Sequence, residues 1–319
     1  MLYSLLKIPA KFAFWIYCRK IKVNNNPLLK SYGPLLIASN HPNSFLDAII
    51  LATLFKHPVH SLARGDAFTN KIYARLLTSL HMFPVYRISE GAEHLEHNYM
   101  TFEKCRKIFK QNGLVLIFSE GRCINEWHLR PLKKGTARLA ISAWNEGIPL
   151  KVLPVGINYS SFSVFGKNIQ VNFGNPITSE YFNKDHSHGK SISDFNIILQ
   201  QQLKDLVFEA GKQDQKNIQE KFYMPQTLFK RTILFLPSIL GWLFHFALFL
   251  PLKNFAWKKA AHNDHYDSVI TGLLFILYPF YLLLVSFLVF ILFGHWYWIL
   301  TFPLLPFFAW SHVQLKHQF

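Results

Sequence analysis

The sequence predicts an α/β fold: a mixed or mostly parallel sheet with helices on both faces, an N-terminal interfacial helix and C-terminal transmembrane helices. Residues 34–175 alternate between short apolar runs and helix-like stretches, which is the pattern of strands joined by crossover helices. Residues 268–310 form a run of 43 without Asp, Glu, Lys or Arg, and one membrane crossing needs only about 20 apolar residues. We therefore expect three regions: a helix at 1–30, a soluble domain at 31–230 and a membrane region of two to three hydrophobic segments at 231–319.

The N-terminal stretch MLYSLLKIPAKFAFWIYCRKIKV mixes large apolar residues with lysine and arginine. Lys7 and Lys11 interrupt its apolar part, which argues against a secretory signal peptide. As a helix it suits a position in the membrane surface, and an ordinary helix packed on the domain core is an equally good interpretation.

The apolar runs place strands and helices through the soluble domain. Strands are expected at 34–40, 59–65, 81–87, 114–121, 150–160 and 169–177, and helices at 44–55, 92–113, 135–147 and 191–211. Two of these helices end at Gly113 and Gly147, a usual C-terminal stop, and the helix at 44–55 begins after Pro42 and Asn43. This order of elements is the basis of the α/β prediction.

The chain is strongly basic, with 34 Lys and Arg against 18 Asp and Glu and a net charge of +16. Residues 1–230 hold 29 of the basic and 16 of the acidic residues, a net charge of +13. Such charge attracts anionic lipid headgroups or nucleic acid. The apolar C-terminal region favours the lipid bilayer as the partner, and we expect no nucleic acid.

The three cysteines, Cys18, Cys105 and Cys123, have no metal-binding or redox spacing. They are typical of a reduced cytoplasmic domain. No metal site is predicted.

The membrane region contains a second uncharged run at 232–252, interrupted by two prolines. A crossing there would carry the three lysines at 253–259 to the far side, against the positive-inside tendency. We therefore expect a re-entrant or surface segment at 232–252, then a hairpin of two spans that turns near Gly294 and His295. The soluble domain is expected on the cytoplasmic side of the cell membrane.

Polar residues follow four of the expected strands, at the carboxyl ends where sites form in open α/β sheets. They are His41, Arg64, Arg87 and the triplet Glu120-Gly121-Arg122. Four such coincidences favour one convergent polar pocket over four unrelated loops.

His41 and Asp47 form a candidate acid–base pair. A carboxylate on one imidazole nitrogen fixes the tautomer, so that the other nitrogen can take a proton from a hydroxyl. On one straight helix, six residues rotate the chain by about 600° and leave the two side chains on different faces. The bend at Pro42 and Asn43 would let them meet. The alternative is that Asp47 merely stabilises a helix N-terminus and His41 is a loop residue.

Four segments together resemble the glycerol-3-phosphate and lysophosphatidic acid acyltransferase superfamily, the membrane enzymes of phospholipid synthesis. They are NHPNSFLD, MFPVYR, FSEGRC and VLPVGINY, in the family's order within about residues 30–180. Two details differ from the commonest motifs. Five residues separate His41 from Asp47 in place of four, and Ser119 replaces a proline while Arg122 comes one position early.

The resemblance implies transfer of a fatty acyl group from acyl-CoA or acyl carrier protein to the hydroxyl of a glycerophospholipid acceptor, lysophosphatidic acid. It implies that His41 is the general base and that Asp47 orients it. No cofactor and no acyl-enzyme are required.

The resemblance also implies where the acceptor binds. Arg87 corresponds to the arginine that holds the acceptor's phosphate, Glu120 and Gly121 would shape the acceptor site, and Arg122 would add positive charge. Lys133 and Lys134 precede an expected helix, where cations and free N–H groups together suit a phosphate of the acceptor or of CoA.

Other functions stay open at this point. The acceptor could be glycerol 3-phosphate or a lyso-aminolipid, and the chain could be a membrane lipid-binding protein without catalysis. A binding protein has no need of a base with its orienting carboxylate, so His41 and Asp47 favour an enzyme.

Overall fold

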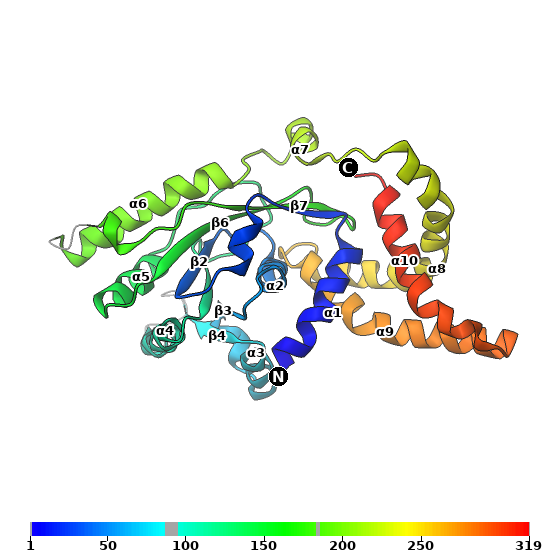
Figure 1. Cartoon of the computed structure of the whole chain (residues 1–319), viewed down its shortest axis with the longest axis horizontal. Coiled ribbons are helices and arrows are strands. Elements are labelled where there is room, and N and C mark those ends of the chain that lie inside the picture. The colour runs from blue at the N-terminus through cyan, green and yellow to red at the C-terminus, as the bar shows by residue number, and fades with distance from the viewer. Residues whose placement is uncertain (1, 87–94, 183–185, 319) are drawn as a thin grey trace.

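The computed structural model describes residues 2–86, 95–182 and 186–318. Its centre is a seven-stranded sheet of order β1-β7-β6-β2-β5-β3-β4 (Figure 1). The strands are β1 (Lys20–Val23), β2 (Leu35–Ser39), β3 (Val59–Arg64), β4 (Met82–Val85), β5 (Leu114–Phe118), β6 (Lys151–Tyr159) and β7 (Asn168–Phe173). Every neighbouring pair is parallel except β6 with β7. The predicted mixed, mostly parallel sheet is confirmed.

Helices cover both faces of the sheet, as predicted. The helices are α1 (Leu2–Tyr17), α2 (Ser44–Leu54), α3 (Lys71–Ser79), α4 (Leu95–Lys110), α5 (Gly135–Asn145), α6 (His188–Leu206), α7 (Gln215–Phe222), α8 (Leu228–Ala260), α9 (Tyr266–Phe293) and α10 (Thr301–Leu315). Successive residues of β2 point to opposite faces: Leu35 and Ile37 pack with α1 and α2, whereas Leu36 and Ala38 pack with α4, α5 and α6. A strand covered on both faces is apolar along its whole length, which explains why β2 and β5 are continuous apolar runs.

The N-terminal region differs from the expected single helix at 1–30. Helix α1 ends at Tyr17, and Lys20–Val23 forms the edge strand β1, which pairs in parallel with β7. One face of α1 packs on α2, while Leu5 and Ile8 are exposed. The helix therefore has a core-facing side and an apolar outer side. The first side fits a helix packed on the domain core, and the second fits a helix in the membrane surface.

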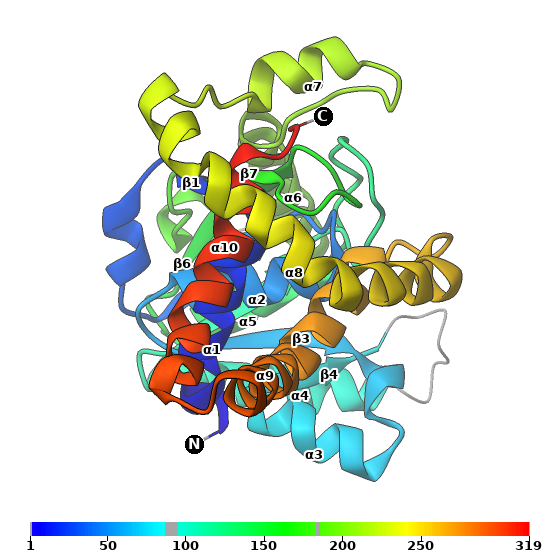
Figure 2. The ribbon, with the colours of Figure 1, turned by 90° about the vertical axis from the view of Figure 1, so that its right-hand side faces the viewer.

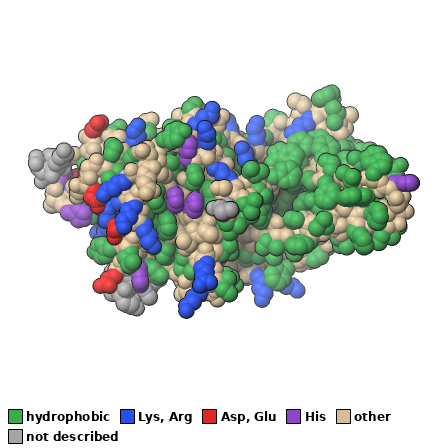
Figure 3. Space-filling view, turned by 60° about the horizontal axis from the view of Figure 1, so that its bottom comes forward, with side chains coloured by type: hydrophobic (Ala, Val, Ile, Leu, Met, Phe, Trp, Pro, Cys, Tyr) green, Lys and Arg blue, Asp and Glu red, His purple; other side chains and the backbone are tan. Residues whose placement is uncertain are grey.

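The C-terminal helices α8 and α9 are long and apolar enough to cross a membrane. Their side of the molecule carries most of the hydrophobic surface in Figure 3. Helix α9 ends before Gly294, whose φ of 62° is left-handed, so the turn lies where it was expected. The lengths differ from expectation: α8 is one continuous helix through 232–252, whereas α10, with 15 residues, falls short of the about 20 that a span requires. It packs along α8 and against α1 (Figure 2).

The membrane region also does not begin cleanly at residue 231. Ala256 and Ala260 at the end of α8, together with Tyr266 and Ile270 at the start of α9, belong to the same buried cluster as α2 and the central strands. The junction of α8 and α9 is therefore part of the core of the α/β domain.

Candidate active site

The candidate site begins where β2 ends. Asn40 joins this strand end to β6, because its side chain accepts a hydrogen bond from the Ile157 N–H at 2.8 Å and donates to the Ile157 carbonyl at 3.0 Å. The chain then turns through residues 41–44 into α2. Ser44 has a φ of 51°, a left-handed conformation that is uncommon for a residue other than glycine. This turn puts His41 above the sheet and Asp47 in the first turn of α2.

His41 and Asp47 meet, as the bend in the sequence predicted. His41 Nδ1 lies 2.9 Å from Asp47 Oδ2. The same carboxylate oxygen accepts the Asn43 N–H at 2.8 Å, and Oδ1 accepts the Tyr159 hydroxyl at 2.6 Å. Burial raises the pKa of Tyr159 well above its ordinary value, so this hydroxyl stays a donor. The extra residue between His41 and Asp47 is accommodated in the turn.

The hydrogen bonds around Asp47 assign the tautomer of His41. An ionised carboxylate only accepts hydrogen bonds, so Nδ1 must carry the hydrogen and Nε2 keeps its free lone pair. Asp47 is fully buried, whereas 19% of the His41 side chain is exposed. The ring stacks on Phe118 with centroids 3.8 Å apart and planes 10° apart. This arrangement leaves a fixed imidazole with one basic nitrogen for an outside hydroxyl.

Glu120 holds the loop that carries His41. Its Oε2 accepts the His41 N–H at 2.8 Å, and its Oε1 accepts the Arg130 N–H at 2.9 Å. Burial raises the pKa of Glu120, and the two backbone donors oppose that rise in part. Both oxygens are thus engaged by main-chain N–H groups, and the expected role of Glu120 in shaping the acceptor site stays a prediction.

Replacing Glu120 by glutamine tests this holding role. The amide has one acceptor where the carboxylate has two, so its NH₂ group would face a backbone N–H. We expect Glu120→Gln to lower kcat by about 10-fold, because displacing a catalytic group by a fraction of an ångström is costly, with little change in the acceptor KM. Steady-state kinetics check this. Glu126→Gln is the matched control, since Glu126 pairs with the Arg130 side chain near the surface at 2.9 Å; a rise in acceptor KM alone would favour the acceptor-shaping role.

The remaining predicted site residues separate into two places. Gly121 has a φ of +66°, and a side chain there would approach Lys133 Cγ to 3.0 Å, so Lys133 lies beside the loop that follows β5. Arg122 is exposed on the same turn. Lys134 is the N-cap of α5 and lines a groove with residues of α6, away from Gly121. Arg87 lies outside the described residues.

Two further side chains approach the site, both from the short connection before α9. His265 has Nδ1 2.7 Å from Ser44 Oγ. Burial lowers the pKa of His265, and the charge of Arg64 lowers it further while that of Asp264 opposes the shift. Asp264 Oδ1 accepts the Asn125 N–H at 3.1 Å. Sequence patterns did not single out residues 264 and 265, because they lie more than 200 positions from His41.

The cysteines do not offer a nucleophile. Burial raises the pKa of Cys18 and Cys105 to about 12 and that of Cys123 further. Cys123 is the nearest to the loop, and its Sγ accepts the Ser44 N–H at 2.9 Å. In the part of the chain that the structure describes, no group of three or more His, Cys, Asp or Glu could hold a metal ion.

Comparisons with known proteins agree with this site. A family model described as Acyltransferase matches residues 20–158. The chain is 28% identical over 121 residues to the 1-acyl-sn-glycerol-3-phosphate acyltransferase of Bacillus subtilis (strain 168), an alignment that covers 38% of this chain and 56% of that protein. The chain therefore matches little more than half the length of this relative.

A solved structure gives a weaker likeness. The crystal structure of the 1-acyl-sn-glycerophosphate (LPA) acyltransferase PlsC from Thermotoga maritima aligns with a TM-score of 0.45 and 15% identity, over 64% of this chain and 78% of that chain. The family match spans β1 through most of β6 and includes both His41 and Asp47. The domain match, the curated relative and the four ordered motifs together support the glycerol-3-phosphate and lysophosphatidic acid acyltransferase superfamily as the family of residues 20–158.

Proposed function

We propose that this chain is a membrane-bound O-acyltransferase that moves a fatty acyl group from acyl-CoA or acyl carrier protein to the hydroxyl of lysophosphatidic acid. The contact between His41 Nδ1 and Asp47 Oδ2 at 2.9 Å carries the proposal. A buried carboxylate that holds a partly exposed imidazole by one nitrogen leaves the other nitrogen as a base. The matched relative is named for transfer to 1-acyl-sn-glycerol 3-phosphate, which supports this acceptor.

In the proposed reaction, His41 Nε2 takes the proton of the acceptor hydroxyl as that oxygen attacks the thioester carbonyl. The carbon–sulfur bond breaks as the tetrahedral intermediate collapses, and the imidazolium returns its proton to the leaving thiolate. Asp47 stabilises the transient imidazolium and keeps the ring in place. The acyl group passes directly from sulfur to oxygen, so the reaction needs no enzyme nucleophile.

The surroundings of the site support a lipid acceptor. Helices α8 and α9 are candidate membrane spans, and their junction packs against the catalytic domain. An acceptor and a product with acyl chains stay in the bilayer, while the thioester donor comes from the aqueous side. We place the catalytic domain on the cytoplasmic side, where both acyl-CoA and acyl carrier protein occur.

Thioester release by the purified full-length protein tests the function. We expect free thiol to appear with lysophosphatidic acid and palmitoyl-CoA or palmitoyl-acyl carrier protein, and phosphatidic acid to form in equal amount. Glycerol 3-phosphate and a lyso-aminolipid serve as alternative acceptors. Transfer to one of these alone would change the acceptor, and absence of transfer to any acceptor would favour a non-catalytic lipid-binding protein.

Two adjacent lysines provide a test of the acceptor's phosphate position. Lys133 lies beside Gly121 and the loop that follows β5, whereas Lys134 faces α6. We expect Lys133→Ala to raise the KM for lysophosphatidic acid about 5-fold, as loss of about 1 kcal/mol of charge interaction would. Lys134→Ala removes the same charge one position away and should leave this KM unchanged. Equal effects of the two variants would mean that only net charge matters.

A further inference from the structure

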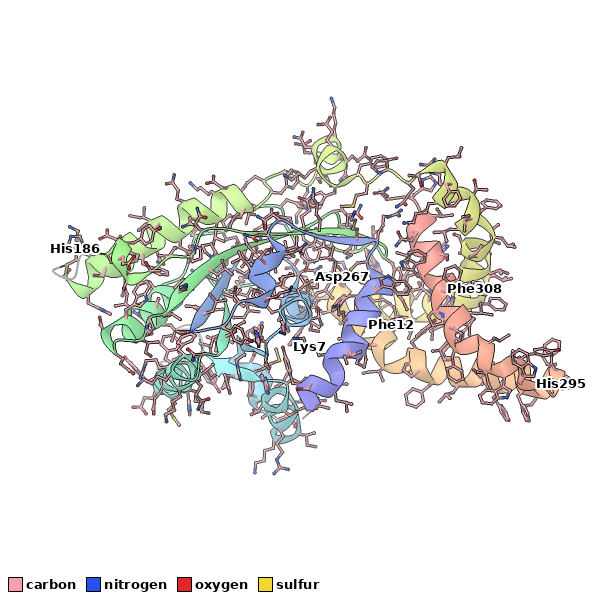
Figure 4. The ribbon with its side chains drawn as sticks, viewed as in Figure 1. Lys7, Phe12, His186, Asp267, His295 and Phe308 are labelled. Carbon is pink, nitrogen blue, oxygen red and sulfur yellow. The ribbon has the colours of Figure 1, made fainter. Side chains whose placement is uncertain are left out.

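Asp267, in the first turn of α9, occupies an unusual position for a carboxylate at the start of a candidate membrane span. It is 1% exposed and lies in the interior of the molecule (Figure 4). Three donors from distant elements converge on it. Tyr17 Oη donates to Oδ1 at 2.6 Å, Asn43 Nδ2 donates to Oδ2 at 2.7 Å, and Lys167 forms a buried ion pair with Oδ2.

Asn43 links this carboxylate to the catalytic pair. The backbone N–H of Asn43 donates to Asp47 Oδ2, the same atom that His41 Nδ1 contacts. The Asn43 side chain is fully buried, its Oδ1 has no hydrogen-bond partner, and it makes no capping bond to α2. The bond from Nδ2 to Asp267 is therefore the polar contact that fixes this side chain.

Charge balance makes Asp267 suitable as an anchor. Lys167 neutralises the charge of Asp267 at close range, so the pair has little electrostatic effect on Asp47. Asp267 therefore acts by fixing the position of Asn43. The short connection before α9 adds two more contacts to the same region, from His265 to Ser44 and from Asp264 to Asn125. Residues 264–267 thus contact both the loop that carries His41 and the loop beside it, which contains Asn125.

We propose that Asp267 is a positioning residue for acyl transfer: through Asn43 it fixes Asp47 and the His41 tautomer, and it makes the start of α9 part of the active site. The proposal rests on the acyltransferase function proposed above. Asp267 lies outside the matched domain, which ends at residue 158. It also gives the membrane helices a role in catalysis beyond attachment.

Asn43→Ala in the full-length protein tests the proposal, because it breaks the link while leaving the Asp267–Lys167 pair and the Tyr17 bond in place. We expect kcat to fall by about 10- to 100-fold, the range for a misplaced catalytic group, with the KM for both substrates within about twofold of wild type. Asn158→Ala is the structural control. Asn158 is 3% exposed and, on β6, points to the opposite face of the sheet from its neighbour Tyr159. Its Nδ2 donates to the Leu206 carbonyl at 2.9 Å and its Oδ1 accepts the Phe208 N–H at 2.7 Å, so this variant loses hydrogen bonds that do not involve Asp47 and should keep its kcat.

A spectroscopic readout separates positioning from loss of packing. In protein labelled with ¹⁵N-histidine and assigned with His41→Ala, the wild-type His41 ring should carry its hydrogen on Nδ1. Asn43→Ala should give a mixture of tautomers, and Asn158→Ala should not. Wild-type kcat and an unchanged tautomer in Asn43→Ala would overturn the proposal, as would an equal loss of kcat in Asn158→Ala. If wild-type protein transfers no acyl group, the proposed function fails, and the tautomer measurement still decides whether Asp267 positions His41.

Discussion

His41→Ala is expected to lower kcat for acyl transfer by at least about 10²-fold, the usual contribution of a general base. Without the imidazole, the acceptor hydroxyl must lose its proton to water while it attacks the thioester. The substitution keeps the hydrogen bond from the backbone N–H of residue 41 to Glu120, so the fold and the membrane association should be preserved. Initial rates of thiol release, together with sedimentation of the variant with membranes, check both parts of this expectation.

A second His–Asp pair in the same chain provides a matched control. His186 Nδ1 lies 2.9 Å from Asp194 Oδ2, the same separation as in the catalytic pair, but the carboxylate of Asp194 is partly exposed. His186 lies at the end of α6 remote from the C-terminal helices (Figure 4). His186→Ala should therefore retain full activity. Full activity of His41→Ala, or an equal loss in His186→Ala, would remove the proton-transfer role of His41.

Local sequence patterns predicted most of the sheet because its central strands are buried on both faces. Such strands are uninterrupted apolar runs, and β2, β5 and β6 lie within the predicted ranges. The edge strand β1 was missed because its sequence KIKV alternates lysine with aliphatic residues beside a basic helix. The short helix α3 was also missed; none of its residues is buried, so it has no apolar face fixed by the core.

The catalytic pair could be predicted, whereas its surroundings could not. His41 and Asp47 are close in sequence, and Pro42 and Asn43 mark the bend between them. Tyr159 and Asp267 reach the same cluster from 112 residues beyond Asp47 and 224 beyond Asn43. The strand order brings Tyr159 there, and the packing of the start of α9 on the core brings Asp267. Glu120 was found by its motif. Its hydrogen bonds to the N–H groups of His41 and Arg130 could not be predicted, because they depend on the positions of two other loop segments.

The largest loss of stability is expected from Lys167→Met. The Lys167 side chain is fully buried and pairs with Asp267, and its Nζ also lies 5.5 Å from the centre of the Tyr17 ring. Burial lowers the pKa of Lys167, and Asp267 opposes that shift. Removing the lysine leaves a buried carboxylate without its counter-ion, so we expect the free energy of unfolding to fall by about 3–5 kcal/mol. Denaturant unfolding in detergent measures it. Lys107→Met, which breaks the exposed pair with Glu103, should have little effect.

The double variant Lys167→Met/Asp267→Asn shows whether the loss comes from the unpaired charge. An asparagine at 267 keeps one acceptor oxygen, so it can accept from either Tyr17 or Asn43, which donate to different oxygens of Asp267. No buried charge remains without a partner. We therefore expect the double variant to be more stable than Lys167→Met alone, since removing both members of a buried ion pair is often nearly neutral. A double variant whose loss equals the sum of the two single losses would show that the charges are not coupled. Recovery of stability would instead show that the two charges of this pair matter chiefly because they neutralise each other, since the amide regains none of the hydrogen bonds that the carboxylate made.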